Sequence, residues 1–304
     1  MTAGEQTYAA AGVSLATADA IVERLRAAVE STRTPETVGA FGAFAGLYAI
    51  DDRRLLAAST DSIGTKPIVA RRRGALRACG ADMAAHCIND VITTGADPLF
   101  LLDYVAASRI DPGQVAELVE GAAEVCRQAG VSILGGETAE LPDVYREHEL
   151  DFAATCVGVV DRDRLIDGSA VGAGDVVVGL PSAGVHANGF TLVRSVLGVE
   201  DYDGPDLLAP TRLYLEDVRR LRGHAHAFAH VTGGGIEGNL RRVLPGGLDV
   251  ELDWSAWERP PVFHWLARHV DEAELRRVFN LGIGYCAVVP DPGDGLVIGR
   301  IVQA

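Results

Sequence analysis

The hexapeptide 61–66 (D-S-I-G-T-K) groups residue types that suit a metal-bound phosphate. It supplies a carboxylate, a glycine that allows close backbone approach, a hydroxyl and an ammonium. It is not a Walker P-loop, in which the lysine precedes the hydroxyl residue. Of the 27 lysine and arginine residues, Lys66 is the only lysine, and its compact point charge suits a phosphate. We therefore expect Asp61, Gly64, Thr65 and Lys66 to bind phosphate; the alternative is a surface turn.

Two further carboxylates stand at the ends of apolar segments. Asp90 lies beside Asn89, and Glu137 follows Gly135 and Gly136, which let the backbone approach a ligand closely. Together with Asp61 they predict an oxygen-only site for Mg²⁺, which prefers carboxylate and phosphate oxygens. Each acid taken alone fits a helix cap or a solvated loop equally well.

A run of glycine and aromatic residues over 38–48 is too permissive for a helix. We interpret it as a mobile loop in which Gly39, Gly42 and Gly46 allow backbone amides to cover a triphosphate. A hinge without a ligand is the alternative.

The second half of the chain contains two glycine-rich turns ahead of predicted helices. His186 and Asn188 precede a helix that begins after Gly189, where an anion is favoured. A second run of amides is formed by Thr232, Gly233, Gly234 and Gly235. Two such turns predict a phosphorylated substrate. Among the histidines only His186 has a supporting motif; those at 224, 226, 230, 264 and 269 have none, and a lone histidine is usually structural.

The elements that position these residues alternate between helix and strand. The pattern predicts an amphipathic helix over 14–33, strands at 55–60, 98–106, 131–134 and 152–160, and helices over 82–94 and 112–130. The strand at 98–106 carries Asp103. Strand, helix and strand in succession indicate an α/β fold. The small and charged segment 161–175 is the best linker, so we expect domains at 1–165 and 166–304. The second domain is predicted to have strands near 176–180, 248–252 and 282–289 and a helix across 211–222.

Composition restricts the class of protein. The 304 residues carry a formal net charge of −15, which repels nucleic acid and anionic membrane surfaces. The five cysteines include no C-x-x-C pair, so neither a zinc knuckle nor a disulfide framework is expected. The N-terminal residues lack a basic signal region. We expect a cytoplasmic protein with no nucleic-acid or membrane partner.

Eight ordered motifs carry a resemblance to a known family. They are T-D-S-I-G-T-K (60–66), G-A-D-M-A-A-H-C-I-N-D (80–90), A-D-P-L-F-L-L-D-Y (96–104), G-G-E-T-A-E-L-P (135–142), H-A-N-G-F-T-L-V-R (186–194), A-P-T-R-L-Y (209–214), T-G-G-G (232–235) and F-N-L-G-I-G (279–284). In order and spacing the chain resembles the phosphoribosylformylglycinamidine cyclo-ligases, or AIR synthetases, over nearly its whole length.

The resemblance implies a two-domain α/β (α+β) fold, with an N-terminal sheet domain that forms a homodimer and a C-terminal sheet flanked by helices. It also implies an Mg²⁺-dependent reaction in which ATP and formylglycinamidine ribonucleotide give aminoimidazole ribonucleotide, ADP and phosphate. Phosphorylation of the formyl oxygen makes it a leaving group, and a nitrogen of the substrate then closes the imidazole ring. The protein mainly positions groups and neutralises charge.

By the same resemblance, Asp61, Lys66, Asp90 and Glu137 match positions near Mg-ATP, and 39–46 matches a glycine-rich loop. His186, Asn188 and the turn 232–235 match substrate-domain motifs. We expect Lys66, Asp61 and His186 to be catalytic, with His186 the candidate for moving the amine proton because its reference pKa is near neutral.

Three residues depart from the family pattern: Ser62 stands in place of a glycine, Pro67 in place of a leucine and His86 in place of a methionine. Divergent relatives of the thiamine-monophosphate-kinase or hydrogenase-maturation type share the ATP domain, but they are not expected to carry H-x-N-G, A-P-T-R and T-G-G-G together. A non-catalytic nucleotide-binding regulator is the other alternative, and it would lose the substrate motifs.

Overall fold

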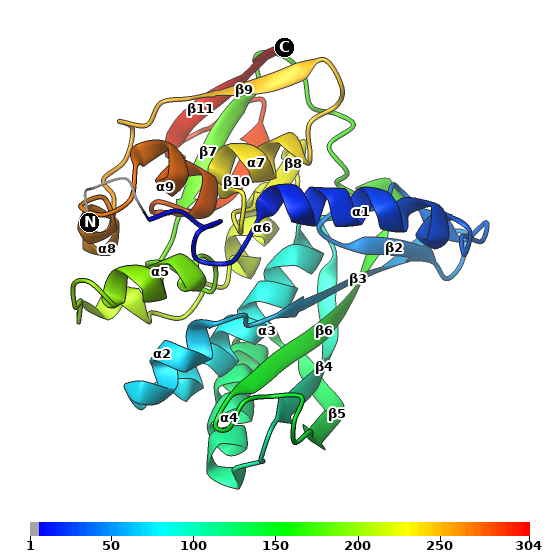
Figure 1. Ribbon diagram of the computed structural model, residues 1–304. Helices are drawn as coiled ribbons and strands as arrows, with labels where there is room; N and C mark the ends of the chain where they lie inside the picture. The colour runs from blue at the N-terminus through cyan, green and yellow to red at the C-terminus, as the bar shows by residue number, and fades with distance from the viewer. Residues whose placement is uncertain (1–5) are drawn as a thin grey trace.

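The N-terminal half of the chain forms a six-stranded sheet in the computed structural model, which describes residues 6–304 (Figure 1). The strand order is β1-β2-β3-β6-β4-β5. The strands are β1 (Thr37–Val38), β2 (Gly46–Ala49), β3 (Arg54–Ser62), β4 (Asp97–Ala107), β5 (Ser132–Glu140) and β6 (Leu150–Asp161). Only β4 and β5 pair in parallel, because a crossover helix joins them.

The helices of this half are α1 (Leu15–Glu30), α2 (Lys66–Arg72), α3 (Leu76–Ile92) and α4 (Pro112–Ala129). Helix α3 covers one face of the sheet by packing on β3, β4 and β6, and α4 packs against α3 and β5. The Asp111 carboxylate caps the first turn of α4, and Gly130 ends the helix in the left-handed conformation, as the sequence predicts. The α3–α4 crossing depends on Gly80, because a Cβ there would lie 1.8 Å from the Leu118 carbonyl oxygen. This close packing fixes the buried helix α3 against the sheet.

The C-terminal half forms a five-stranded antiparallel sheet in the order β8-β10-β7-β11-β9. Its strands are β7 (Val176–Pro181), β8 (Ala227–His230), β9 (Leu248–Leu252), β10 (Ile283–Val289) and β11 (Val297–Gln303). Its helices are α5 (Phe190–Leu197), α6 (Leu215–Leu221), α7 (Gly235–Arg241), α8 (Pro261–Leu266) and α9 (Glu272–Val278), with 3₁₀ turns η1 (Arg162–Arg164) and η2 (Pro205–Leu207). The predicted α/β (α+β) fold with two sheets is confirmed.

Four element predictions need correction. The helix predicted over 82–94 covers Leu76–Ile92. The strand predicted at 131–134 continues through Gly135, Gly136 and Glu137, so Glu137 lies inside β5 instead of following it. Pairing with β4 keeps this segment extended: a register shift between Leu101 and Leu102 leaves Leu134 without a partner, and Gly135 and Gly136 pair opposite Leu102 and Asp103. The helix predicted across 211–222 covers only Leu215–Leu221, and the predicted loop 38–48 is reduced to the residues between β1 and β2.

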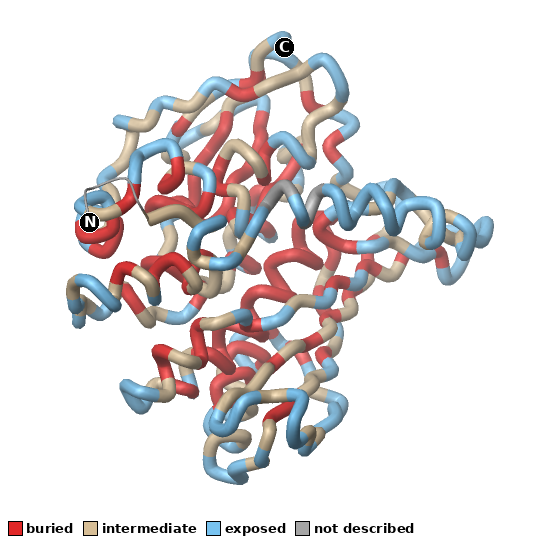
Figure 2. Tube along the Cα trace, in the orientation of Figure 1, coloured by how far each residue is buried: buried red, intermediate tan, exposed pale blue. Residues whose placement is uncertain are grey.

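The two sheets are joined at the centre of the molecule. The predicted boundary near residue 165 falls between β6 and β7, but the halves are not loosely tethered, since α3 contacts α6 and α2 contacts α5. Figure 2 shows buried residues running along α3 and into the C-terminal sheet. No helix within residues 6–304 has the length and apolar character needed to cross a membrane.

Candidate functional site

Two carboxylates from different elements lie on the covered side of the N-terminal sheet and are linked through two histidines. Alternation along β3 turns Leu55, Ala57 and Ser59 towards the helices, and Asp61 follows the same alternation. The Ser59 hydroxyl donates to Asp90 Oδ2 on α3 at 3.0 Å. The Asp61 side chain is 40% exposed, whereas Asp90 is buried. Asp61 is therefore accessible to a ligand, whereas Asp90 is buried and fixed by the Ser59 hydroxyl.

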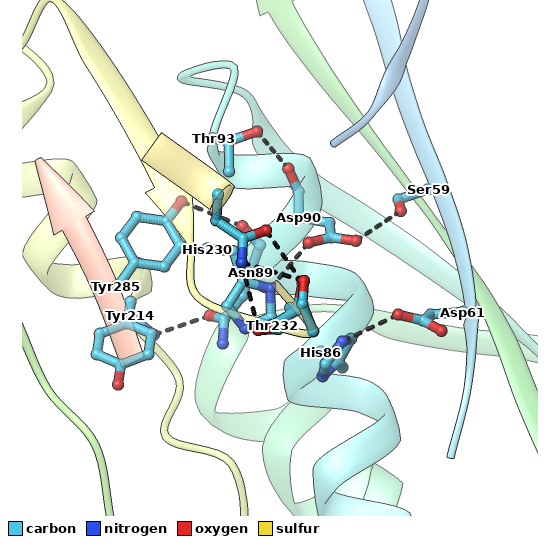
Figure 3. Close-up of polar contacts among 12 residues, drawn as sticks. Ser59, Asp61, His86, Asn89, Asp90, Thr93, Tyr214, His230, Thr232 and Tyr285 are labelled. Atoms are coloured by element: carbon cyan, nitrogen blue, oxygen red, sulfur yellow. Dashed lines mark hydrogen bonds and ion pairs between the residues drawn. The ribbon is translucent and has the colours of Figure 1, made fainter. Parts of the chain in front are cut away.

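Two histidines complete this network (Figure 3). His86 Nε2 lies 2.9 Å from Asp61 Oδ2, and His230 Nδ1 lies 2.8 Å from Asp90 Oδ1. Their ring centroids are 4.7 Å apart. Because His230 ends β8 in the C-terminal half, the contact joins the two domains at the site.

The electrostatics of the two histidines differ. Burial acts to lower the pKa of His86, but the Asp61 carboxylate, with Asp90 and Asp82 behind it, raises that pKa to about 9. Burial acts to raise the pKa of Asp61, but the charge and the hydrogen bond of His86 outweigh this effect, so the pKa of Asp61 is lowered. For His230, burial lowers the pKa despite the bond to Asp90. The site thus contains a charged His86–Asp61 pair next to a His230 whose neutral form is favoured.

The glycine-rich segment is held over the same region by Arg242. The Arg242 guanidinium carbon lies 3.8 Å from the centroid of the Phe44 ring, and its Nη2 donates to the Gly42 carbonyl at 3.3 Å. Burial lowers the pKa of Arg242, and the charges of Asp90 and Asp61 act in the opposite direction. Gly39 and Gly42 have φ of 74° and 103°, while Gly46 begins β2. The loop between β1 and β2 therefore closes against the C-terminal domain near the carboxylates.

The T-G-G-G turn begins two residues after His230 and is fixed by a buried amide. Asn239 Nδ2 donates to the carbonyls of residues 232, 233 and 235. Asn188 Oδ1 lies 3.9 Å from where a Cβ on Gly233 would stand. At Gly235 (φ 66°) a Cβ would lie 1.8 Å from a backbone carbonyl, so this position needs glycine. Asn188 and the run Thr232, Gly233, Gly234 and Gly235 therefore lie together, next to His230.

His186 has a buried position that does not fit its predicted role. The residue is 1% exposed and has a φ of 64°. Its Nε2 accepts from the backbone N–H of Ala183 at 3.1 Å and of Arg212 at 3.5 Å. Burial lowers the pKa of His186 well below its usual value. A ring that is enclosed, neutral and already accepting hydrogen bonds cannot readily take a substrate proton. Gly189, with φ 78°, immediately precedes α5, and a Cβ there would clash with the ring of Phe279.

Lys66 is also enclosed. Its side chain is fully buried, and Nζ lies 2.6 Å from Asp82 Oδ2. Nζ also donates to the carbonyls of His186 at 2.8 Å and Ala209 at 3.2 Å. The preceding Thr65 hydroxyl lies 3.2 Å from that of Thr191. The predicted phosphate contact of Lys66 has no support in this geometry.

Asn89 belongs to the same joint between the domains. It is fully buried, its Nδ2 donates to the Arg212 carbonyl at 2.8 Å, and its Oδ1 accepts from the Tyr214 N–H at 3.0 Å. Its amide is therefore occupied by the A-P-T-R-L-Y segment and is not free for the predicted nucleotide contact. Gly64, with φ 60°, shapes the turn between β3 and α2.

The strand register separates Glu137 from the other two acids. One row of paired residues crosses strands β3, β6, β4 and β5. It contains Asp61, Ala154, Asp103 and Gly136, in that order. Residues in one such row share a face, so Asp61 and Asp103 point to the helix side. Glu137 occupies the next row, opposite Tyr104, and so points to the other face. Burial raises the pKa of Asp103.

This placement leaves two acids at the predicted metal site. Within the part of the chain that is described, no three His, Cys, Asp or Glu side chains gather closely enough to hold a metal ion. Asp61 and Asp90 still fit Mg²⁺ that arrives with a nucleotide, because Mg²⁺ binds through one or two carboxylates together with phosphate oxygens. Within one chain Glu137 is not a third ligand.

Comparison with known proteins shows the family to which the chain belongs. Family models described as AIR synthase related protein, N-terminal and C-terminal domains, match residues 42–160 and 172–297. Phosphoribosylformylglycinamidine cyclo-ligase from Synechococcus sp. (strain CC9605) is 45% identical over 311 residues, covering 96% of this chain and 90% of the relative. The enzyme of that name from Sorangium cellulosum is 45% identical over 93% of this chain and 88% of its own length. The chain belongs to the phosphoribosylformylglycinamidine cyclo-ligase family.

Membership of this family confirms the resemblance carried by the eight motifs and makes the chain a ligase. A solved structure described as AaThiL complexed with AMPPCP and TMP matches with a TM-score of 0.67 over 96% of this chain and 93% of its own, at 16% identity. That identity shows a shared fold alone. The thiamine-kinase-like and hydrogenase-maturation-like alternatives therefore lack the sequence support that the cyclo-ligase family has.

Three residues at the site were not predicted from the sequence of this cyclo-ligase: His230, Arg242 and Asn239. His230 ends an apolar run two residues before the T-G-G-G turn, which was a usable signal. Arg242 carries no local signal, because its partners Gly42 and Phe44 lie far away in the sequence. The partners of Asn239 are local, four to seven residues before it, so its place after the T-G-G-G turn was also a usable signal. Of the departures, Pro67 occupies the first turn of α2, where proline is tolerated, and His86 pairs with Asp61.

Proposed function

We propose that this chain uses ATP to cyclise formylglycinamidine ribonucleotide to aminoimidazole ribonucleotide, releasing ADP and phosphate in de novo purine synthesis. The observation that carries the proposal is the contact of Asp90 with His230, which stands two residues before the T-G-G-G turn, next to the His86–Asp61 pair at the joint between the domains. The names of the curated relatives and the binding of AMPPCP, an ATP analogue, by a structural neighbour support it.

In this proposal the nucleotide enters from the exposed side of Asp61. Mg²⁺ carried by ATP would be held by Asp61 and Asp90 and would neutralise phosphate charge. Backbone amides of the loop containing Gly39 and Gly42 would cover the phosphates. Arg242 supplies the nearby positive charge, because its guanidinium is held at the loop by Phe44 and Gly42 and makes no ion pair within residues 6–304.

The substrate would lie against Asn188 and the turn 232–235, whose N–H groups suit its phosphate or amide oxygens. The γ-phosphoryl group of ATP passes to the formyl oxygen, and ADP leaves. An amidine nitrogen then attacks the formyl carbon, a proton is lost, and the C–O bond breaks to release phosphate. The domains contribute by holding the two reactants in line and by excluding water.

The direct test mixes the purified chain with Mg-ATP and formylglycinamidine ribonucleotide and follows aminoimidazole ribonucleotide and ADP. Equal amounts of both products are expected. Binding of AMPPCP without formation of either product would instead support the nucleotide-binding regulator.

We also propose a homodimer formed through the uncovered face of the N-terminal sheet. This face exposes Leu102 (43%) and Leu134 (63%), and burying apolar surface drives association. Leu102→Asp should give a monomer in analytical ultracentrifugation, whereas Val297→Asp, at a residue 44% exposed on β11, should not. Because Glu137 lies on the dimer face, its predicted role near magnesium would require the partner. Equal sedimentation of Leu102→Asp and the unmodified chain would contradict this interface.

We place the reaction in the cytoplasm. All five cysteines are buried and unpaired, which suits a reducing compartment.

A further inference from the structure

Lys66 stands at a point where both domains and two substrate-domain segments converge. It begins α2, its ion-pair partner Asp82 lies on α3, and both side chains are fully buried. The other two contacts of Nζ are main-chain carbonyls of the C-terminal domain, at His186 and Ala209. The ammonium also lies 5.4 Å from the centroid of the Phe190 ring.

The polar groups of this cluster face one another inside the protein. An ammonium has three donors and no acceptor, and Nζ has three oxygens around it. Asp82 Oδ1 accepts from both the N–H and the hydroxyl of Thr211, at 2.7 and 2.8 Å. Nζ donates two hydrogen bonds to carbonyls and is ion-paired with Asp82, and both side chains are fully buried. A phosphate would therefore have to displace a protein group to reach Lys66.

The segments that Lys66 holds are those that shape the substrate side of the site. His186 adopts a left-handed backbone conformation, which a side chain-bearing residue keeps only where its surroundings enforce it. Asn188 follows two residues later and reaches Gly233 of the T-G-G-G turn. Asp82 meanwhile fixes Thr211 of the A-P-T-R segment.

We propose that Lys66 is a positioning residue for the ribonucleotide substrate and not a ligand of ATP. With Asp82 it sets the H-x-N-G and A-P-T-R segments against the N-terminal domain. Its loss therefore weakens the use of formylglycinamidine ribonucleotide while leaving the nucleotide contacts intact. This inference rests on the proposed function for its kinetic readout, but nucleotide binding and lysine accessibility test it independently of turnover.

The first experiment uses the wild-type chain and the fact that it has one lysine. The folded protein is treated with an acetylating reagent, with and without AMPPCP and Mg²⁺, and the peptide containing Lys66 is quantified by mass spectrometry. Lys66 should resist acetylation to the same extent in both samples and react fully in denaturant. A Lys66 that reacts in the folded protein and is protected by AMPPCP would overturn the proposal.

The second experiment separates the two substrates. Lys66→Met alone would leave Asp82 as an unpaired buried charge, so the double variant Lys66→Met/Asp82→Leu removes both charges. Asp82→Asn is the milder variant should the double variant not fold. In the folded variant, KM for formylglycinamidine ribonucleotide should rise about tenfold, while the Kd for AMPPCP by calorimetry stays within about twofold.

Arg222→Met is the matched control. Arg222 Nη1 pairs with Asp97 Oδ2 at 3.0 Å across the same two domains, but it is partly exposed and away from the substrate segments. Both constants should stay within about twofold of wild type. A Kd for AMPPCP raised tenfold in the Lys66 or Asp82 variants, or an unchanged KM for the ribonucleotide, would refute the positioning role. If wild type forms no product, the proposed function fails, and the acetylation and Kd results still decide whether Lys66 is a nucleotide ligand.

Discussion

The Lys66–Asp82 pair and the Asp61–Asp90 network contain similar charges but differ in what surrounds them. Around Lys66 and Asp82 the contacts come from buried protein groups, and neither side chain is exposed. Around Asp61 and Asp90, one carboxylate is 40% exposed, and a cationic residue and a glycine-rich loop lie close by. The first cluster holds the domains together, and the second leaves capacity for a ligand.

The difference shows that charge and motif membership do not by themselves assign a role. A buried ion pair costs desolvation free energy, which its hydrogen bonds offset. Its charges therefore interact with each other and with protein groups, and not with a ligand. A carboxylate that keeps solvent access can exchange water for Mg²⁺ and phosphate. Both kinds of residue occur in the hexapeptide 61–66. Asp61 belongs to the partly exposed Asp61–Asp90 network, and Lys66 belongs to the buried Lys66–Asp82 pair.

The largest effect is expected for Asp61→Asn, which keeps the side-chain shape and removes the charge. Because the carboxylate is proposed to hold Mg²⁺ against the transferring phosphate, kcat should fall roughly 10²–10³-fold. Steady-state kinetics with saturating Mg-ATP would measure it. Asp161→Asn, on the same sheet but at the far end of β6, is the control. Equal activities of the two variants would contradict the proposal that the Asp61–Asp90 network binds the ligand.

An intermediate effect is expected on stability for His86→Met. The pKa of His86 is raised to about 9 in the folded chain, so its stabilisation is fully present below about pH 6.5 and is lost as the pH rises through about 9. A shift of this size corresponds to roughly 3 kcal/mol. The difference in unfolding free energy between wild type and variant should therefore shrink from pH 6 to pH 10 in urea titrations. A difference that stays constant over this range would show that the His86–Asp61 pair carries no such energy.

The sequence predicted the local parts of this structure well and the long-range parts poorly. Helix α4 follows from Asp111, Pro112 and Gly130, whose preferences act within one turn. The family motifs also predicted the joining of Asn188 with the T-G-G-G turn as a substrate region. The separation of Glu137 from Asp61 could not be predicted, because it depends on the register between β4 and β5.

The roles of the two histidines illustrate the same limit. His186 has a motif but is enclosed, while His230 has no motif and contacts Asp90 across 140 positions of sequence. Burial and hydrogen-bond partners decide the chemistry of an imidazole, and neither can be obtained from residue spacing. Arg242 was missed for the same reason, since Phe44 and Gly42 lie about 200 positions away.

The smallest effect is expected for Arg242→Ala, and it sharpens the contrast with Lys66. Arg242 is proposed to supply the positive charge that Lys66 does not supply, so the variant should raise KM for ATP roughly tenfold, the loss expected for one hydrogen bond to a charged group. KM for the ribonucleotide should change little, which is the reverse of the pattern expected for Lys66. Arg241→Ala is the neighbouring control, because Arg241 pairs with Asp249 and Glu237 on the surface. If Arg241→Ala and Arg242→Ala raise KM for ATP equally, the effect comes from general charge, and Arg242 has no specific place at the phosphates.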